Sequence, residues 1–285
     1  MNMNLVLQGP SATPERLHRI AALANPARVV QLGEKAVRCE EVATSDFLKQ
    51  TIEVAATAAG LDATFIAPGR SLADFKLVAM DMDSTLITIE CIDEIADMQG
   101  LKGQVAKITE AAMRGDLDFS ESLARRVALL RGLDAAALER VYTERLAISM
   151  GGEAMLKAVQ AAGLKTLLVS GGFTFFTERL KERLGLDYTQ ANVLETKDGK
   201  LTGRVTGIIV DAEEKRRSVE RVCMVMGIHP REAIVMGDGD NDLKMMWIAG
   251  LSVAFRAKPV VRGQADVALN FSGLDGLLTI LASDQ

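Results

Sequence analysis

Short apolar runs, each bounded by glycine or aspartate, recur through the last three quarters of this 285-residue chain. Runs of this kind, separated by segments with helical spacing, are typical of parallel strands covered by helices on both faces. We therefore expect an α/β fold built around a Rossmann-like parallel sheet. The five runs cover residues 77–80, 166–169, 233–236, 251–255 and 265–269.

Two further units are predicted beside this sheet. Residues 1–74 alternate extended and helical patterns and end near the linker-like segment 68–71, which predicts a small α/β accessory domain followed by a principal domain over 75–285. The long gap after the first apolar run is rich in Ala, Leu, Glu and Arg at helical spacing, which predicts an inserted helical cap at about 88–155. An Asp198-Gly199 turn predicts a β-hairpin.

Composition narrows the classes of partner. A net charge of -5 gives no general attraction for nucleic acid or for an anionic membrane surface, so we expect neither as a partner. The three cysteines are far apart and odd in number, which is typical of reduced thiols. The chain has no signal-peptide pattern and no apolar run near the roughly 18 residues that a membrane span needs. We expect a cytoplasmic protein.

Two acidic clusters each follow an apolar run. Asp81 and Asp83 follow the first run, and Asp238 and Asp242 follow the third. Because ligands of open α/β sheets bind beyond the carboxyl ends of the strands, we expect the four carboxylates to share one crevice. Hard oxygen ligands of this kind suit Mg²⁺, which needs few protein carboxylates and keeps several waters. The sequence thus predicts a magnesium site formed by these four residues.

A third cluster has the composition of an anion cradle. Ser170, Gly171 and Gly172 follow the second run and precede a helical pattern over 175–184. A hydroxyl and closely approaching backbone N–H groups at a helix N-terminus stabilise a dianion. Lys215, ahead of another helical stretch, is a candidate source of fixed positive charge.

These motifs occur in a characteristic order. DMDST at 81–85, SGG at 170–172, a lysine and GDGDND at 237–242 resemble the four motifs of haloacid dehalogenase-type phosphatases over residues 76–285. The resemblance implies Mg²⁺-dependent hydrolysis of a phosphate ester through an aspartyl-phosphate intermediate. It also implies a role for each matching residue: Asp81 as nucleophile, Asp83 as general acid and base, Ser170, Gly171, Lys215 and Asn241 as phosphate or substrate binders, Asp238 as metal ligand, and Asp242 as support for the metal.

In the inserted segment the resemblance to a known family becomes closer. The stretches around Glu90, Met113, Phe119 and Arg126 resemble phosphoserine phosphatases, whose reaction is the last step of serine biosynthesis. The resemblance implies that Glu90 meets the ammonium of O-phosphoserine, that Arg126 binds its carboxylate, and that Met113 and Phe119 close over it. A zwitterion does require one fixed anion and one fixed cation, and a guanidinium clasps a carboxylate with two parallel hydrogen bonds.

Two alternatives remain open at this stage. A second alcohol such as homoserine could replace water as the acceptor, which would make the protein a phosphotransferase. The N-terminal pattern resembles a degenerate ACT domain, which implies amino-acid sensing or homodimer formation through residues 1–74. Every catalytic motif lies beyond the 68–71 linker, so we expect the accessory domain to be dispensable for the chemistry itself.

Overall fold

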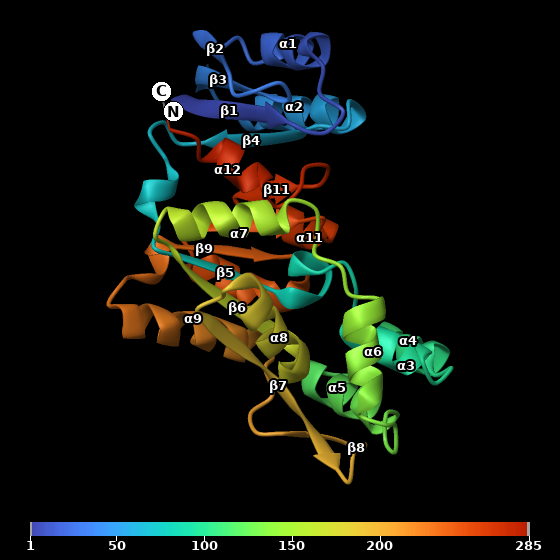
Figure 1. Ribbon diagram of the computed structural model, residues 1–285. Helices are drawn as coiled ribbons and strands as arrows, with labels where there is room; N and C mark the ends of the chain where they lie inside the picture. The colour runs from blue at the N-terminus through green and yellow to red at the C-terminus, as the bar shows by residue number, and fades with distance from the viewer. Residues whose placement is uncertain (1, 284–285) are drawn as a thin grey trace.

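The N-terminal part of the chain forms a four-stranded antiparallel sheet with two helices on one face (Figure 1). The computed structural model describes residues 2–283. Both helices begin at side-chain caps, because Thr13 and Ser45 accept hydrogen bonds from the N–H groups of Arg16 and Leu48. The strand order is β2-β3-β1-β4. The elements are β1 (Asn2–Gln8), α1 (Pro14–Leu23), β2 (Arg28–Gln31), β3 (Ala36–Ala43), α2 (Asp46–Ala58) and β4 (Asp62–Ile66).

The principal sheet has seven strands in the order β11-β10-β9-β5-β6-β7-β8. Every neighbouring pair is parallel except β7 and β8, which form the predicted hairpin. The predicted Rossmann-like parallel sheet is therefore confirmed. The strands are β5 (Leu77–Met80), β6 (Lys165–Phe173), β7 (Tyr188–Lys197), β8 (Lys200–Thr206), β9 (Ala233–Gly237), β10 (Leu251–Phe255) and β11 (Val267–Leu269).

Helices cover both faces of this sheet. Leu77 and Ala79 of β5 pack into one apolar cluster with α9 (Ala212–Met226) and α10 (Leu243–Ile248), because alternate side chains of a strand point to opposite faces. Val78 and Met80 pack into the other cluster with α7 (Gly152–Ala161), α8 (Thr174–Leu184) and α12 (Gly276–Ile280). Figure 1 shows α7 and α9 on opposite sides of the sheet. Within residues 2–283, no helix combines the length and the apolar composition that a membrane crossing needs.

Four helices form the inserted segment between β5 and α7. The chain leaves and re-enters the core side by side, since Ile87 and Ile148 form an antiparallel bridge and Ser149 N–H donates to the Leu86 carbonyl at 2.9 Å. The hairpin contacts the insert through Leu201, whose carbonyl accepts from Gly132 N–H at 2.8 Å. The predicted limits of the cap, at about 88 and 155, stay a prediction. The helices are α3 (Cys91–Asp97), α4 (Lys102–Met113), α5 (Phe119–Ala128) and α6 (Ala136–Glu144).

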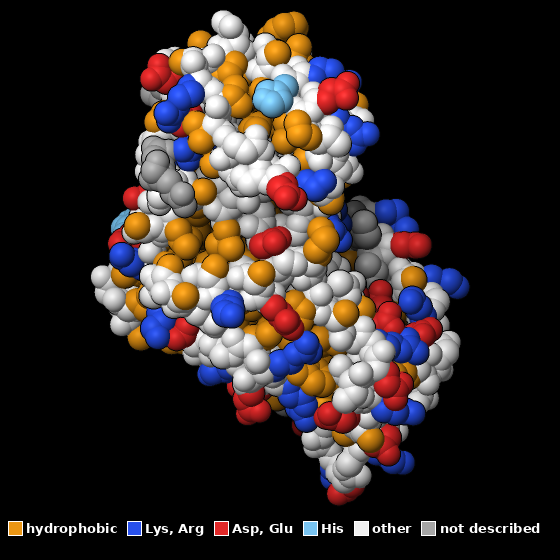
Figure 2. Space-filling view, turned by 45° about the horizontal axis from the view of Figure 1, so that its top comes forward, with side chains coloured by type: hydrophobic (Ala, Val, Ile, Leu, Met, Phe, Trp, Pro, Cys, Tyr) orange, Lys and Arg blue, Asp and Glu red, His pale blue; other side chains and the backbone are white. Residues whose placement is uncertain are grey.

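The N-terminal sheet docks on the end of the chain. The buried Asp62 carboxylate accepts hydrogen bonds from the N–H groups of Asn270, Phe271 and Ser272, in the loop after β11. Gln8 donates its side-chain N–H to the Gly276 carbonyl at 3.0 Å. On the face drawn in Figure 2, basic and acidic side chains are interspersed.

Candidate active site

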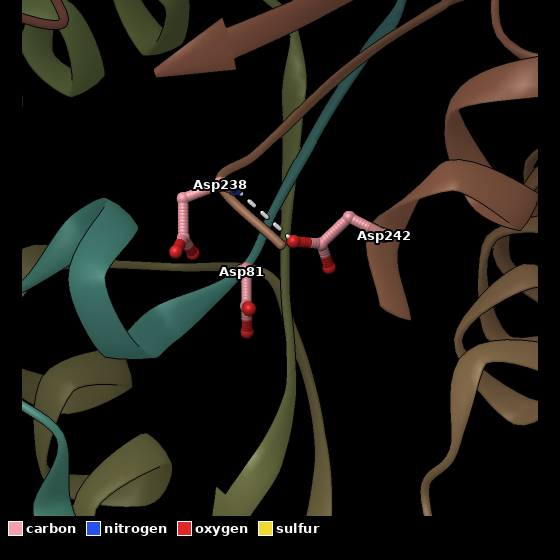
Figure 3. A group of neighbouring side chains, drawn as sticks. All are labelled: Asp81, Asp238 and Asp242. Carbon is pink, nitrogen blue, oxygen red and sulfur yellow. Dashed lines mark hydrogen bonds between the residues drawn. The ribbon is translucent and has the colours of Figure 1, made fainter. Parts of the chain in front are cut away.

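The site lies where the carboxyl ends of β5, β6 and β9 meet. Asp81 follows directly after β5, and Asp238 follows directly after the neighbouring strand β9, so the two carboxylates come together at one edge of the sheet (Figure 3). The backbone fixes Asp81 in this place. Its N–H donates to the Met236 carbonyl at 3.0 Å, and its Oδ1 accepts from Met82 N–H at 2.7 Å.

Lys215 links the two acidic clusters. Its fully buried Nζ lies 2.8 Å from Asp81 Oδ2 and 2.8 Å from Asp242 Oδ1. A buried ammonium is tolerated when carboxylates compensate its charge. Burial lowers the pKa of Lys215, but Asp242 and Asp81 outweigh this effect and hold that pKa above its ordinary value. Lys215 is therefore a permanent positive charge beside Asp81.

The carboxylates can hold a cation. One oxygen from each of Asp81, Asp238 and Asp242 lies within 4.8 Å of the others. Burial, and then the Asp242 charge, raises the pKa of Asp81 well above its ordinary value and that of Asp238 to about 7. When all three carboxylates are ionised, they carry two negative charges more than the Lys215 ammonium compensates. A divalent ion with a preference for oxygen ligands fits that set.

The structure distinguishes the four predicted metal residues. Asp242 already accepts N–H groups from Asp238 and Gly239, each at 3.1 Å, in addition to Lys215, so its carboxylate braces the loop as well as facing the site. Gly237 must be glycine, because a Cβ there would lie 2.4 Å from Asp242. Asp83 lies outside the three-carboxylate group among the described residues, and its part in metal binding stays a prediction.

Asp83 lies in the turn after β5 and is held by a backbone hydrogen bond. Its Oδ1 accepts from Cys91 N–H at 3.3 Å, and the chain turns sharply at the next residue, Ser84, which adopts a φ of 55°. Burial, and next the Glu90 carboxylate, raises the pKa of Asp83 to about 8. A carboxyl group with a pKa near neutrality can donate a proton and later accept one, as a general acid and base must.

The Ser170–Gly172 segment, here called the glycine loop, is a bulge within β6 near its carboxyl end and has no room for larger side chains. The buried Ser170 Oγ accepts from Gly172 N–H at 2.8 Å. A Cβ on Gly172 would lie 2.9 Å from Asp83 Oδ2, and a Cβ on Gly171 would lie 2.9 Å from Phe119 Cζ. The ring of Phe119 in the cap thus touches the predicted phosphate loop of the core.

The four remaining predicted residues lie in different environments. Glu90 is exposed and accepts a hydrogen bond from Ser84 Oγ at 2.6 Å, and desolvation raises its pKa. Arg126 on α5 is half-buried, and burial lowers its pKa against the opposing charges of Asp93, Glu90 and Asp83. It forms no ion pair with the described residues. Asn241 lies in the turn after β9, half-buried. Met113 ends α4, and its side chain lies outside the described residues.

Comparison with known proteins agrees with this geometry. The family model for haloacid dehalogenase-like hydrolases matches residues 78–246, which include both acidic clusters, the glycine loop and Lys215. The chain belongs to the haloacid dehalogenase-like hydrolases. A curated relative from Polaromonas sp., named phosphoserine phosphatase, is 57% identical over 227 residues, which are 78% of this chain and 96% of that protein.

Two solved structures of haloacid dehalogenase relatives cover the whole architecture. One is a HAD family hydrolase from Salmonella enterica serovar Typhi, with a TM-score of 0.90 and 30% identity over 99% of this chain and 100% of that one. The other is a probable phosphoserine phosphatase from Vibrio cholerae, with a TM-score of 0.84 and 36% identity over 99% of this chain and 86% of that one. The N-terminal sheet is therefore part of the shared fold.

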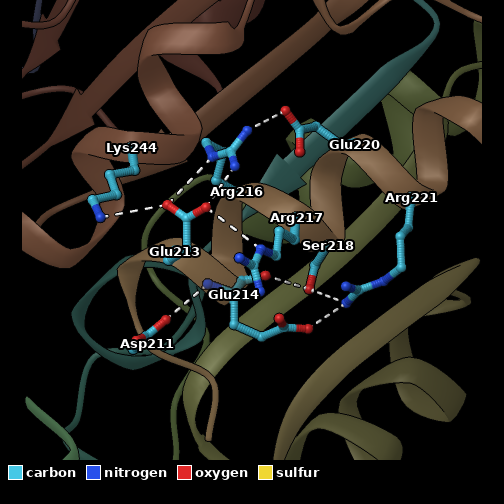
Figure 4. Close-up of polar contacts among 9 residues, drawn as sticks. All are labelled: Asp211, Glu213, Glu214, Arg216, Arg217, Ser218, Glu220, Arg221 and Lys244. Atoms are coloured by element: carbon cyan, nitrogen blue, oxygen red, sulfur yellow. Dashed lines mark hydrogen bonds and ion pairs between the residues drawn. The ribbon is translucent and has the colours of Figure 1, made fainter. Parts of the chain in front are cut away.

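A charged network orients the helix that carries Lys215 in this haloacid dehalogenase-like hydrolase (Figure 4). Asp211 caps α9 by accepting from Glu214 N–H at 2.8 Å, and Glu214 pairs with Arg221 at 2.6 Å. Glu213 lies 3.4 Å from Lys244 of α10, which follows the Asp238–Asp242 turn. The network therefore ties the helix bearing Lys215 to the helix after the acidic loop.

Sequence reasoning missed two buried residues beside the site. Thr85 is fully buried and donates its hydroxyl hydrogen to Asp238 Oδ1 at 3.2 Å. Asn192 on β7 bonds to the backbone of the glycine loop. Thr85 belongs to the DMDST motif at 81–85, but the sequence analysis gave it no role. No sequence pattern indicated a role for Asn192.

Proposed function

We propose that this hydrolase is a phosphoserine phosphatase that converts O-phosphoserine and water to serine and phosphate. The proposal rests on two sets of side chains that come together at one site. Asp81, Asp83 and Lys215 are suited to phosphoryl transfer, while Glu90 and Arg126 offer opposite charges to a zwitterion. The name of the Polaromonas relative supports the choice of substrate.

In the proposed first step, a carboxylate oxygen of Asp81 attacks phosphorus, and the bond from phosphorus to the serine oxygen breaks. Asp83, protonated near neutral pH because of its raised pKa, gives its proton to the departing oxygen. Lys215 offsets the negative charge that gathers beside Asp81. Serine leaves, and an aspartyl phosphate remains on Asp81.

In the second step Asp83, now ionised, takes a proton from water, which attacks phosphorus and releases phosphate from Asp81. We propose Mg²⁺ as the cofactor, held by Asp81 and Asp238 with support from Asp242 and, as the sequence predicts, Asp83. A bound divalent cation supplies charge neutralisation between the carboxylate and the phosphoryl oxygens.

The proposal for substrate recognition assigns one group to each end of the serine moiety. Glu90 binds the ammonium, and Arg126 binds the carboxylate with its planar guanidinium. Phe119 lies over Gly171, which supports a role for the cap in covering the bound substrate. Met113 and Asn241 keep their predicted parts in substrate binding.

We further propose a cytoplasmic location and a homodimer formed through the N-terminal domain. The three cysteines are buried and free, as expected in a reducing compartment. Strand β2 lies at the outer edge of the N-terminal sheet, and an edge strand offers backbone groups to a second copy.

A substrate panel tests the function. The enzyme is assayed with Mg²⁺ on O-phosphoserine, on O-phosphoethanolamine, which lacks the carboxylate, and on an aryl phosphate. We expect kcat/KM for phosphoserine to exceed that for phosphoethanolamine by roughly 30-fold or more, the scale of one desolvated charge pair. Equal values would contradict the proposal. Added homoserine distinguishes hydrolysis from transfer, since transfer yields phosphohomoserine in place of free phosphate.

A further inference from the structure

Asn192 lies where the regular pairing of two central strands is interrupted. Val169 of β6 is paired with Gln190 of β7, and the next pair joins Phe173 to Asn192. Three residues of β6, 170–172, therefore stand opposite the single residue Ala191. A bulge of this kind removes backbone N–H and C=O groups from the hydrogen bonds between the strands. Such groups need another hydrogen-bond partner when they are buried.

The Asn192 side chain supplies that partner. It is 1% exposed, and its Nδ2 donates to the Gly171 carbonyl at 2.8 Å. Its Oδ1 accepts from Val210 N–H at 2.9 Å. Val210 precedes Asp211, which caps α9, and Lys215 follows one turn later on that helix. One amide group thus joins the loop that carries Ser170 to the start of the helix that carries Lys215.

The two joined segments lie close together. A Cβ on Gly171 would lie 3.6 Å from the Val210 carbonyl, so the backbones nearly touch. Glycines give the 170–172 loop wide conformational freedom, and a side-chain amide that both donates and accepts fixes it in one place.

We infer that Asn192 is a positioning residue that sets the shape of the phosphoryl pocket by locking the Ser170–Gly172 loop to the N-terminus of α9. This inference rests on the proposed phosphoryl-transfer site but not on the choice of phosphoserine. Because Asn192 acts on groups that meet the phosphoryl oxygens, its loss affects every phosphate ester alike. A residue that reads the serine moiety, such as Arg126, affects only phosphoserine.

Asn192→Ala removes both hydrogen bonds. We expect kcat/KM to fall on the order of 100-fold for phosphoserine and for an aryl phosphate alike, the scale of misplacing a catalytic group by about 1 Å. Val193→Ala is the matched control on the same strand, because Val193 is exposed and has no part in the site. It should retain activity within twofold. The melting temperature of each variant reports on folding.

The pH dependence of the activity of Asn192→Asp separates a positioning role from a purely structural role, because a purely structural role would not change it. Its carboxyl group still accepts from Val210 N–H, but when ionised it places an oxygen against the Gly171 carbonyl and repels it. When protonated it donates an O–H there and restores the bond. Burial favours the protonated form. The activity of Asn192→Asp relative to the native protein should therefore rise at least fivefold between pH 8.5 and pH 5.5, whereas the relative activity of Asn192→Ala stays flat.

Several outcomes would overturn the inference. It fails if the relative activity of Asn192→Asp does not depend on pH, if folded Asn192→Ala keeps activity within threefold, or if the loss is confined to phosphoserine. Where Asn192→Ala does not fold, Asn192→Asp alone decides. The aryl phosphate assay keeps this test independent of the proposed substrate. If the native enzyme were inactive on phosphoserine but active on the aryl ester, only the choice of phosphoserine as substrate would be refuted.

Discussion

Replacing Arg126 with alanine separates recognition of serine from phosphoryl transfer. Arg126 is half-buried, is surrounded by the charges of Asp93, Glu90 and Asp83, and forms no ion pair with the described residues. Its Nε donates to the Ser122 carbonyl at 3.4 Å, and the proposal assigns the guanidinium to the serine carboxylate. Truncating one member of a desolvated charge pair costs about 2–5 kcal/mol. At about 1.4 kcal/mol for each factor of ten, kcat/KM for phosphoserine should fall roughly 30- to 5,000-fold.

The assay compares two substrates and two neighbouring arginines. An aryl phosphate has no carboxylate, so its kcat/KM should change less than about threefold in Arg126→Ala, or under 0.7 kcal/mol. Arg125→Ala is the matched control, because Arg125 lies on the same helix but is exposed and pairs with Glu121 across one turn. An exposed pair of this kind contributes only about 0.3–0.5 kcal/mol. Arg125→Ala should therefore leave both substrates nearly unchanged.

Two results would refute the reasoning. Equal losses on both substrates would mean that Arg126 supports the fold or the phosphate site, and not the serine carboxylate. Equal effects of Arg125→Ala and Arg126→Ala would mean that α5 needs both side chains for its stability. Unfolding of each variant in urea shows whether the helix is intact.

Three further predictions concern the chemistry and the domains. Asp81→Asn should fold normally but lose turnover, since an amide is no nucleophile, and near-native phosphate release by a pure sample would contradict that role. EDTA should abolish phosphate release and Mg²⁺ should restore it, whereas activity without any divalent ion would count against the role of Asp238. A protein that begins near Ser71 should keep kcat within about tenfold, or 1.4 kcal/mol, while melting at a lower temperature because the amides that Asp62 satisfies are exposed. If a folded sample kept less than one-thousandth of the activity, the N-terminal domain would have to help build the site.

Local patterns were enough to predict most of the elements. The apolar run 77–80 depends only on neighbouring residues, and the structure confirms it as strand β5. Strand β3 was not predicted, because Arg38, Glu40 and Glu41 interrupt its apolar pattern. It exists because β1 and β2 pair with it on either side, and such pairing joins residues far apart in the chain.

The sequence by itself determined which residue types follow which strands, and therefore that the carboxylates, the glycine loop and a lysine would gather at one edge of a parallel sheet. Only the tertiary structure decided their contacts. The 2.8 Å approach of Lys215 to Asp81, the Phe119 ring over Gly171 and the two hydrogen bonds of Asn192 each join different elements. Hydrogen bonds and van der Waals contacts act over a few ångströms, so they exist only once packing has fixed where each element lies.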